Sequence, residues 1–436
     1  MLYHFYTFLQ EHKLNFIGSG LFQYITFRLI MAIIASLLIA TIFGKKIILF
    51  LKKHQIGESV RELGLEGQEQ KKGTPTMGGI IILVSIIFPT LLFANLDKVY
   101  IRLMLLCTIW LGLIGFLDDY FKLKARKKAK ELGEKYIKRD SDGLAGITKV
   151  AGQIGLGLII GLTLYFSSAV NVEREIKLSK LILNKGEKIN KDTNIVVRKL
   201  NGVERTFVKV HTPITTIPFI KNHEFNYSRL VTWIGEGYEK YTWIIYVIIV
   251  IFIVVAVSNG ANLTDGIDGL AAGVSAIIGM TLGIFVYISG NTVLADYLNV
   301  MYIPNLGELS IFVGAFIGAC VGFLWYNTYP AQVFMGDTGS LALGGIIASL
   351  AIIVRKEWLI PIFCFVFLIE NLSVIIQTSV FKYTRKKYGV GKRVLLMSPI
   401  HHHFQKKGLH ENKIVMRFWI ITLLCCIVSI LTLKIR

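Results

Sequence analysis

The sequence predicts an all-α, multi-pass membrane protein with about ten transmembrane helices and a small, β-rich extracytoplasmic insert. Hydrophobic residues make up 53% of the 436 positions, charged residues only 17%, and the mean hydropathy is +0.58. Soluble domains carry about 25% charged residues, so this chain is too apolar for that class. A transmembrane helix needs roughly 20 apolar residues to cross a hydrocarbon core about 30 Å thick, and many apolar runs here approach that length.

The expected spans follow one another in two groups. They lie at 21–43, 77–95, 99–117 and 150–169, and then at 241–261, 269–289, 309–327, 340–354, 358–380 and 415–433. The runs at 269–289 and 340–354 are rich in glycine, and small residues allow transmembrane helices to pack closely. We therefore expect one membrane domain, formed by 1–169 and 241–436, with an insert at 170–240.

The distribution of basic residues predicts the orientation. Lysines and arginines concentrate in 44–76, 118–149 and 381–414, whereas 290–308 contains neither. Connections rich in lysine and arginine remain in the cytoplasm, which places both termini and the insert outside. The net charge of +20 is then explained by basic residues that orient the chain in the membrane and bind anionic ligands. We expect no nucleic-acid partner.

The insert at 170–240 carries many basic residues, but long translocated segments largely escape the charge rule. Residues 193–198 and 206–210 alternate apolar and polar side chains with β-branched residues, as short strands do. We expect a passive cap without a catalytic role. The five cysteines all lie in apolar runs, so we expect them to pack in the core and to form no disulfides.

Five short polar segments carry the residues with chemical potential, and the predicted topology places all five on the cytoplasmic face. They are Lys71–Gly79, Leu117–Lys122, Asn262–Leu270, Phe334–Ser340 and Ser398–Phe404. Acidic residues at the mouth of a span are costly unless they face water, a cation or a partner. The alternative for Asn262–Leu270 is a polar turn, and for Asp118-Asp119 a solvated helix end beside Lys122.

Together these segments predict phosphoryl transfer at the bilayer surface. That reaction needs a divalent cation, carboxylates to hold it, and cationic side chains on the remaining phosphate oxygens. Carboxylates are the hard oxygen ligands that Mg²⁺ accepts. The candidate carboxylates are Asp118, Asp119, Asp265, Asp268 and Asp337, and the candidate cations are Lys71, Lys122 and Lys149.

Three consecutive histidines, His401, His402 and His403, also suggest zinc, for which imidazole is a common ligand. Adjacent side chains point in different directions, however, and the sequence has no supporting Cys-x-x-Cys or His-Glu-x-x-His pattern. We expect these histidines to donate hydrogen bonds to a phosphate or a sugar.

The segments resemble the bacterial phospho-N-acetylmuramoyl-pentapeptide transferase family, in family order from about residue 45 to Arg436. The resemblance implies an enzyme of the bacterial inner membrane with its active site facing the cytoplasm. It also implies transfer of phospho-N-acetylmuramoyl-pentapeptide from its UDP carrier to undecaprenyl phosphate, with release of UMP, a Mg²⁺ cofactor, contact with membrane lipids and a homodimer. The strings that carry it are Gly-Thr-Pro-Thr-Met-Gly-Gly at 73–79, Asp-Asp-Tyr at 118–120, Asn-Leu-Thr-Asp-Gly-Ile-Asp-Gly-Leu at 262–270, Phe-Met-Gly-Asp-Thr-Gly-Ser at 334–340 and Met-Ser-Pro-Ile-His-His-His-Phe at 397–404.

The same resemblance implies a role for each matching residue. Asp337 resembles the magnesium ligand, and Phe334 offers a ring face on which the uracil base stacks. The catalytic set is Asp118, Asp119, Asp265, Asp268, His401, His402, Lys122 and Lys149. The substrate-binding set is Lys71, Thr76, Asn262, Gly266, Ile267, Asn327, Phe334 and His403.

Two departures and several alternatives remain. A lysine-rich run near Lys127–Arg139 lengthens the chain after Asp119, and Gln405 stands where the family often has an acidic residue. Two routes remain open: the lipid phosphate attacks the nucleotide substrate directly, or the reaction passes through an aspartyl-phosphate intermediate. The alternative functions are a related polyprenyl-phosphate sugar-1-phosphate transferase and a transporter with Glu370 and Gln377 along its path.

Overall fold

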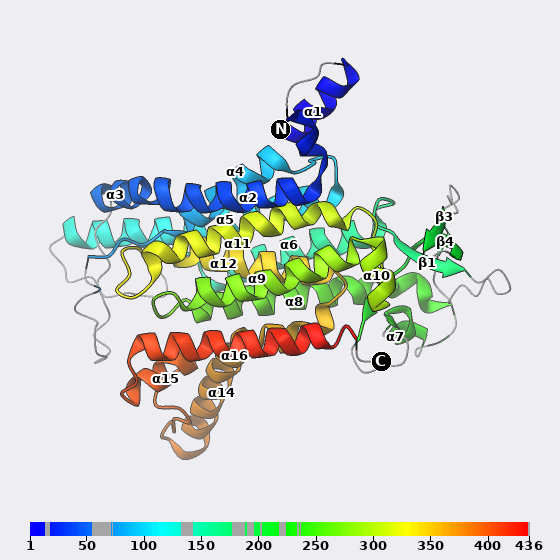
Figure 1. The fold of residues 1–436 in the computed structure, drawn as a ribbon. Coiled ribbons are helices and arrows are strands. Elements are labelled where there is room, and N and C mark those ends of the chain that lie inside the picture. The colour runs from blue at the N-terminus through cyan, green and yellow to red at the C-terminus, as the bar shows by residue number, and fades with distance from the viewer. Residues whose placement is uncertain are drawn as a thin grey trace.

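The computed structural model describes residues 1–13, 18–54, 71, 73–131, 143–176, 188–189, 196–200, 203–217, 224–232, 235 and 237–434. Most long helices run side by side in one bundle, and α14 projects from it at a steep angle (Figure 1). The long helices are α2 (Ile25–Leu38), which continues through η2 (Ile39–Phe43) into α3 (Gly44–His54), then α4 (Gly79–Phe93), α5 (Val99–Glu131), α6 (Gly146–Phe166), α8 (Thr242–Thr264), α9 (Leu270–Ser289), α11 (Leu309–Asn327), α12 (Gly336–Ile353), α14 (Phe365–Tyr388) and α16 (Glu411–Leu431). The short helices are α1 (Leu2–Glu11), η1 (Ser19–Gln23), α7 (Ser228–Thr232), η5 (Tyr238–Tyr241), α10 (Thr292–Leu298), η6 (Leu306–Glu308), η7 (Glu357–Leu359), α13 (Ile360–Phe363) and α15 (Ile400–Lys406).

These helices match the ten expected spans in order. Within the described residues, nine helices are long and apolar enough to cross a membrane. The expected span at 77–95 corresponds to α4, a shorter apolar helix of 15 residues. Several boundaries differ from expectation. The first span continues through η2 and α3 to His54 instead of ending at 43, and α14 ends at Tyr388 instead of 380. Helix α5 continues past the predicted end at 117 to Glu131, and α14 begins at Phe365, after the separate short helices η7 and α13.

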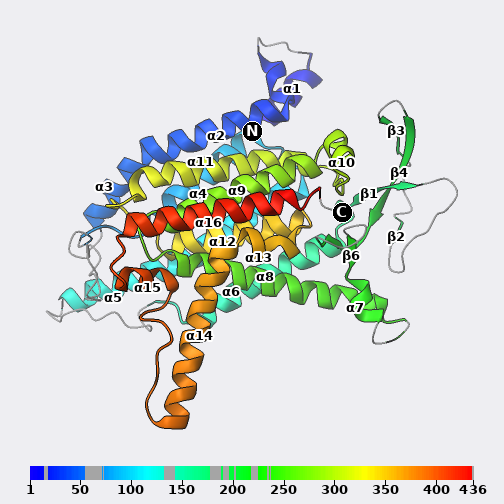
Figure 2. The same ribbon diagram turned by 60° about the horizontal axis from the view of Figure 1, so that its bottom comes forward.

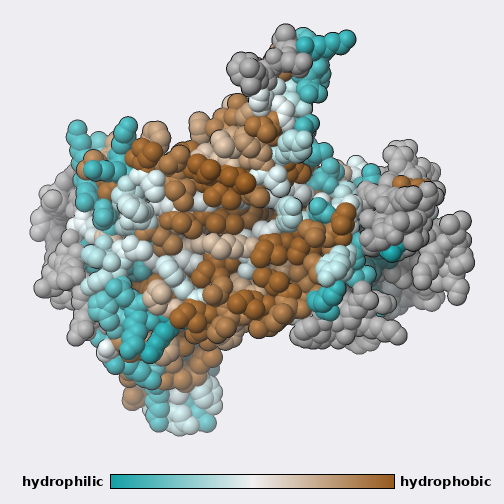
Figure 3. Space-filling model, in the orientation of Figure 1, coloured by the Kyte–Doolittle hydropathy of each residue, from teal (hydrophilic) through white to brown (hydrophobic). Residues whose placement is uncertain are grey.

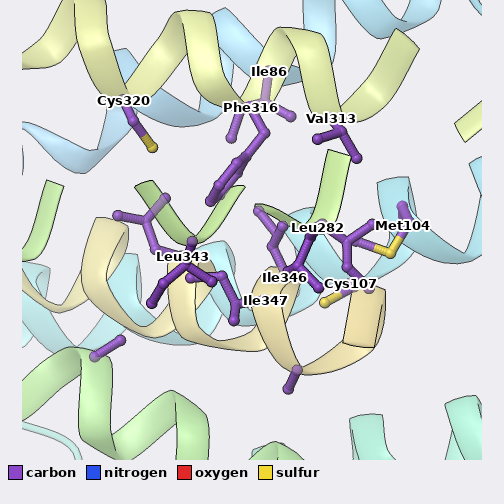
Figure 4. Packing of buried hydrophobic residues seen from close by; sticks show 14 of the residues in the cluster. Ile86, Met104, Cys107, Leu282, Val313, Phe316, Cys320, Leu343, Ile346 and Ile347 are labelled. Atoms are coloured by element: carbon purple, nitrogen blue, oxygen red, sulfur yellow. The ribbon is translucent and has the colours of Figure 1, made fainter. Parts of the chain in front are cut away.

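The core of the bundle is built around α12. Every side chain from Thr338 to Ile353 is buried, and α12 packs against α4, α5, α8 and α9. Close-up, Leu343, Ile346 and Ile347 of α12 lie among side chains of α4, α5, α9 and α11 (Figure 4). Glycine permits this close packing: a Cβ at Gly344 would lie 2.6 Å from the Cα of Ser258 in α8. The five cysteines are all free, as expected.

The outer surface of the bundle is apolar. A broad hydrophobic band covers its middle, with hydrophilic residues toward the ends (Figure 3). Large side chains such as Phe252 and Trp325 are more than two-thirds exposed within this chain. Exposed apolar surface on this scale is costly in water and is favourable in hydrocarbon. The chain is therefore a multi-pass membrane protein.

The insert contains the expected strands. In one sheet β4 (Val203–His211) pairs antiparallel with β1 (Val172–Ile176), β2 (Lys188–Ile189) and β3 (Val196–Leu200), and a second sheet pairs β5 (Ile214–Thr216) with β6 (Glu224–Asn226). The expected strand at 206–210 lies within β4, while 193–195 lie outside the described residues. The insert is tied to the end of α12, because the Tyr227 hydroxyl donates to Glu357 Oε1 at 2.8 Å and Lys356 Nζ donates to Thr216 Oγ1 at 3.1 Å.

The two ends of the bundle differ. The strands and the C-terminus lie at one end, whereas α3, the end of α5 and α15 lie at the opposite end (Figure 2). The polar segments singled out from the sequence gather at this second end, through contacts described below.

Candidate functional site

Backbone hydrogen bonds join two of the polar segments. Phe334 N donates to the carbonyl of Pro75 at 2.9 Å, and Gly78 N and Gly79 N donate to the carbonyls of Phe334 and Met335, each at 2.8 Å. Gly79 must be small, since a Cβ there would lie 2.2 Å from the backbone nitrogen of Gly339. The segment before α4 is therefore paired with the first turn of α12.

Three carboxylates meet at this end of the bundle. Asp118 and Asp119 extend from α5 and Asp337 from the first turn of α12, and one oxygen atom from each lies within 4.8 Å of the others. Asp118 and Asp119 are buried, and Asp337 is 17% exposed. We refer to these three residues as the carboxylate cluster. Asp265 and Asp268 do not belong to it in the part of the chain that the structure describes.

Asp119 fixes the first turn of α12. Its carboxylate accepts hydrogen bonds from Asp337 N at 3.2 Å, from Thr338 N at 2.9 Å and from Thr338 Oγ1 at 2.6 Å. The first N–H groups of a helix have no partner within the helix, and a negative charge there is favourable. Asp119 thus caps α12 from a neighbouring helix and holds Asp337 in place.

Asp118 and Asp337 share two lysines. Lys122 Nζ lies 2.5 Å from Asp118 Oδ2 and 3.2 Å from Asp337 Oδ2. Lys149 Nζ lies 2.9 Å from Asp118 Oδ2 and 2.5 Å from Asp337 Oδ2. Lys122 reaches Asp118 because it follows one helical turn later, while Lys149 approaches from α6. The two lysines place positive charge beside the cluster, where phosphate oxygens would need it.

The donor set of the cluster suits a hard divalent cation. Mg²⁺ takes oxygen ligands, usually one or two carboxylates together with water and substrate phosphates. The carboxylate of Asp119 caps the first turn of α12, whereas Asp118 and Asp337 face each other across Lys122 and Lys149, so Asp118 and Asp337 are the better candidate ligands. Asn262 Nδ2 donates to Asp337 Oδ1 at 3.0 Å and to Ser340 Oγ at 2.8 Å, which orients the Asp337 carboxylate.

A second group of polar residues surrounds Lys71. Lys71 Nζ lies 2.8 Å from Asp268 Oδ1 and 2.8 Å from both carboxylate oxygens of Glu411, the first residue of α16. Gln405 Nε2 donates to Glu411 Oε1 at 2.7 Å, and its oxygen lies 2.6 Å from His402 Nδ1. We call these five residues the Lys71 network. Burial opposes the charged form of Lys71, but the two carboxylates outweigh it and raise its pKa, so Lys71 is a cation at neutral pH.

His401 is enclosed at the edge of this network. Its ring is fully buried, and its Nδ1 lies 3.1 Å from Oε2 of Glu370, which is also fully buried. Nε2 of His401 lies against Gly266, where an added Cβ would be only 2.2 Å away. Gly266 therefore keeps room for His401. Glu370 and Gln377, which suggested a transport path, instead hold the loop before α15, because Glu370 accepts from Ile400 N at 3.1 Å and Gln377 accepts from Leu395 N at 2.9 Å.

The remaining candidates lie in the same region. Asn327 is buried and uses both ends of its amide, accepting from Gly269 N at 3.1 Å and donating to the Val333 carbonyl at 2.9 Å. Ile267 is buried, whereas Asp265, at the end of α8, is partly exposed. Phe334 and Thr76 are also partly exposed, and His403 Nδ1 accepts from Leu396 N at 3.1 Å. The lysine-rich run near Lys127–Arg139 lies mostly outside the described residues.

Sequence reasoning missed the part played by Glu411. It pairs with Lys71, 340 residues away, and no local pattern records a contact between such distant positions. The available signal was its place in a polar stretch immediately before an apolar run, where a carboxylate is costly without a partner.

Acidification should weaken the fold through His402. Burial, with smaller effects from His401 and Lys71, lowers the pKa of His402 to about 4, while an unfolded histidine titrates near 6.5. The unfolded chain therefore binds more protons between these values, and the contribution of His402 is complete above about pH 6.5 and is lost as the pH falls toward 4. Thermal unfolding in detergent should show a larger loss of stability between pH 7 and pH 5 for wild type than for His402→Gln. Equal losses would contradict this assignment.

A membrane bundle with clustered carboxylates and lysines at one end provides the groups that a transferase needs to bind anionic substrates at the bilayer surface. Consistent with this, residues 193–355 match glycosyl transferase family 4, and residues 71–83 match phospho-N-acetylmuramoyl-pentapeptide-transferase signature 1. Proteins named phospho-N-acetylmuramoyl-pentapeptide-transferase from Flavobacterium psychrophilum, Flavobacterium johnsoniae and Parabacteroides distasonis are 55%, 52% and 50% identical to this chain. Each match covers 100% of both proteins. The chain belongs to the phospho-N-acetylmuramoyl-pentapeptide transferase family and is an enzyme.

Proposed function

We propose that this protein transfers phospho-N-acetylmuramoyl-pentapeptide from its UDP carrier to undecaprenyl phosphate and releases UMP. The observation that supports this most directly is the pair of carboxylates, Asp118 and Asp337, that shares Lys122 and Lys149 at the end of a membrane bundle. The relatives named for this activity match along the whole length of the chain.

The reaction joins two anionic substrates, so the site must offset their charge. The attacking oxygen belongs to the lipid phosphate, and the bond that breaks links the sugar-side phosphorus to the oxygen of UMP. A phosphate monoester has a second pKa near 6, so this nucleophile is mostly dianionic at neutral pH and needs little deprotonation. We therefore propose that Asp118 positions the lipid phosphate and does not deprotonate it. Lys122 and Lys149 would contact the phosphate oxygens.

The proposed cofactor is Mg²⁺, held by Asp118 and Asp337. When bound, it would neutralise phosphate charge and polarise the phosphorus–oxygen bond that breaks. The residues of the chain organise the rest: Asp119 anchors Asp337 through α12, and Asn262 orients the Asp337 carboxylate. The resemblance implies that Lys71, Gly266, Ile267, Asn327 and Phe334 bind the uridine, with Phe334 offering its ring to the base.

We also propose the bacterial inner membrane as the location, with the site facing the cytoplasm. The five polar segments lie at the end of the bundle opposite the strands (Figure 2), and the basic segments favour the cytoplasmic side for that end. Both termini and the insert would then lie outside. Membrane lipids surround the apolar band, and a homodimer is proposed from family likeness alone.

The decisive experiment is UMP release by the purified protein. We expect release only when UDP-N-acetylmuramoyl-pentapeptide, undecaprenyl phosphate and Mg²⁺ are all present, with loss on chelation by EDTA and recovery when Mg²⁺ is restored. Release of more than one equivalent of UMP per enzyme without the lipid phosphate, or full activity in EDTA, would contradict the proposal. Labelled phosphate trapped on the protein with the nucleotide substrate alone would instead support the two-step route through an aspartyl-phosphate.

The second candidate is a related transferase that acts on another UDP-sugar, because clustered carboxylates do not by themselves choose the sugar. An assay with alternative UDP-sugars separates the two. Transport is disfavoured because Glu370 and Gln377 are bonded to neighbouring backbone and side-chain groups.

A further inference from the structure

His402, Gln405 and Glu411 form a chain of hydrogen bonds. Glu411 determines which group Gln405 donates, and Gln405 in turn determines which nitrogen of His402 carries the proton. Glu411 directs both carboxylate oxygens at the ammonium of Lys71, each at 2.8 Å, so it is ionised and can only accept. Gln405 must therefore present its NH₂ group to Glu411, which it does at 2.7 Å. The partners of Gln405 therefore determine the orientation of its amide group.

The orientation of Gln405 fixes the tautomer of His402. With its NH₂ group on Glu411, Gln405 presents its carbonyl oxygen to His402 Nδ1 at 2.6 Å. A carbonyl oxygen can only accept, so Nδ1 must carry the proton. A neutral imidazole has one N–H, and Nε2 of His402 is then left with a free lone pair. The low pKa of His402, about 4, agrees with a neutral ring.

The free nitrogen of His402 is available to a ligand. The His402 ring is partly exposed, and Nε2 has no hydrogen-bond partner among the residues that the structure describes. The neighbouring His403 has the opposite arrangement, because its Nδ1 accepts a hydrogen bond from Leu396 N and a neutral ring must then carry its proton on Nε2. Adjacent histidines in this segment therefore differ in hydrogen-bonding role.

We propose that Gln405 and Glu411 are positioning residues that fix His402 as a hydrogen-bond acceptor for an N–H or O–H group of the nucleotide-sugar substrate. The lipid phosphate is excluded as its partner, since a phosphate dianion offers only acceptors. The nucleotide-sugar substrate carries hydroxyl and amide donors, and His402 is linked through Gln405 and Glu411 to Lys71, at the expected uridine site. This differs from the donor role expected of all three histidines from the sequence. The identity of the substrate rests on the proposed function, but the tautomer does not.

The tautomer is tested without any assay of activity. The full-length protein, labelled with ¹⁵N-histidine in detergent, would be examined at pH 7 by long-range ¹H–¹⁵N correlation, with His402 assigned from its absence in His402→Gln. We expect a protonated Nδ1 and an unprotonated Nε2 for His402, and the reverse for His403. In Gln405→Leu the preference at His402 should be lost while His403 is unchanged. A proton on Nε2 of His402 in wild type would overturn the proposal.

The acceptor role is tested by two substitutions of His402. Glutamine can still accept a hydrogen bond, whereas lysine can only donate. Leaving a buried donor of the substrate unpaired costs about 10- to 100-fold. We expect His402→Gln to raise KM for UDP-N-acetylmuramoyl-pentapeptide by less than about tenfold, His402→Lys to lower kcat/KM by about 100-fold or more, and KM for undecaprenyl phosphate to stay unchanged in His402→Gln.

Activity of the lysine variant equal to that of the glutamine variant would overturn the acceptor role. If the lysine variant does not fold in thermal unfolding, the tautomer measured in wild type decides. If wild type shows no transfer with these substrates, the proposed function fails while the NMR result still reports the role of His402.

Discussion

Asp337→Ala is expected to abolish UMP release while leaving the fold intact, with a loss of about 10³-fold or more, the size associated with removing several kcal/mol of transition-state stabilisation. The substitution removes one of the two carboxylates best placed to hold a divalent cation. Among the residues that the structure describes, it also leaves Asp118 as the one carboxylate that contacts both Lys122 and Lys149. The helix itself should persist, because the cap of α12 is supplied by Asp119 and Thr338.

Asp296→Ala provides a matched control for Asp337→Ala. Asp296 is also paired with a cation, Arg205 at 2.8 Å, and its side chain is 23% exposed, against 17% for Asp337. It lies in α10, beside the insert, far from the proposed chemistry. We expect normal UMP release from Asp296→Ala and unchanged thermal midpoints for both variants. Near-normal activity of Asp337→Ala at saturating Mg²⁺ would remove Asp337 from the centre of the mechanism.

The roles within the carboxylate cluster could be separated only with the structure. Asp118 and Asp119 are adjacent in sequence and equally plausible as ligands, yet they point to different partners. Asp118 contacts the two lysines, and Asp119 contacts the first turn of α12. Successive side chains on a helix point about 100° apart, so two adjacent carboxylates contact different neighbouring helices. Here α12 covers one face and α6 approaches the other.

The sequence predicted the order of the spans because each membrane crossing needs a long apolar run, a property that is local. It did not predict where helices end. Residues 118–131 of α5 include many strong helix formers, so the helix continues after its apolar part stops. Contacts between distant segments were also missed. Glu370 entered the sequence analysis only through the transporter alternative, whereas in the structure it is buried against His401, a partner that no spacing in the sequence indicates.

Gly115→Ala is expected to lower both stability and activity, because the backbones of α5 and α12 approach closely at this point. A Cβ on Gly115 would lie 2.2 Å from the carbonyl oxygen of Asp337 and 2.6 Å from Thr338 N. These are backbone atoms, which cannot rotate away, so the helices would have to separate. Overpacking of this kind costs about 1–3 kcal/mol, and a displacement of about 1 Å at the carboxylates costs about 100-fold in rate.

Gly155→Ala separates this effect from the general cost of replacing a glycine in a helix. Gly155 lies in α6, and a Cβ there would meet only the Trp110 ring, at an ordinary distance of 3.4 Å. We expect a lower thermal midpoint and at least about a 100-fold loss of UMP release for Gly115→Ala, and neither change for Gly155→Ala. If both variants behaved like wild type, the close contact of α5 with α12 would not be what holds Asp118, Asp119 and Asp337 together. The catalytic geometry would then have to depend on Lys122 and Lys149 instead, since these are the other side chains that join α5, α6 and α12 at the cluster.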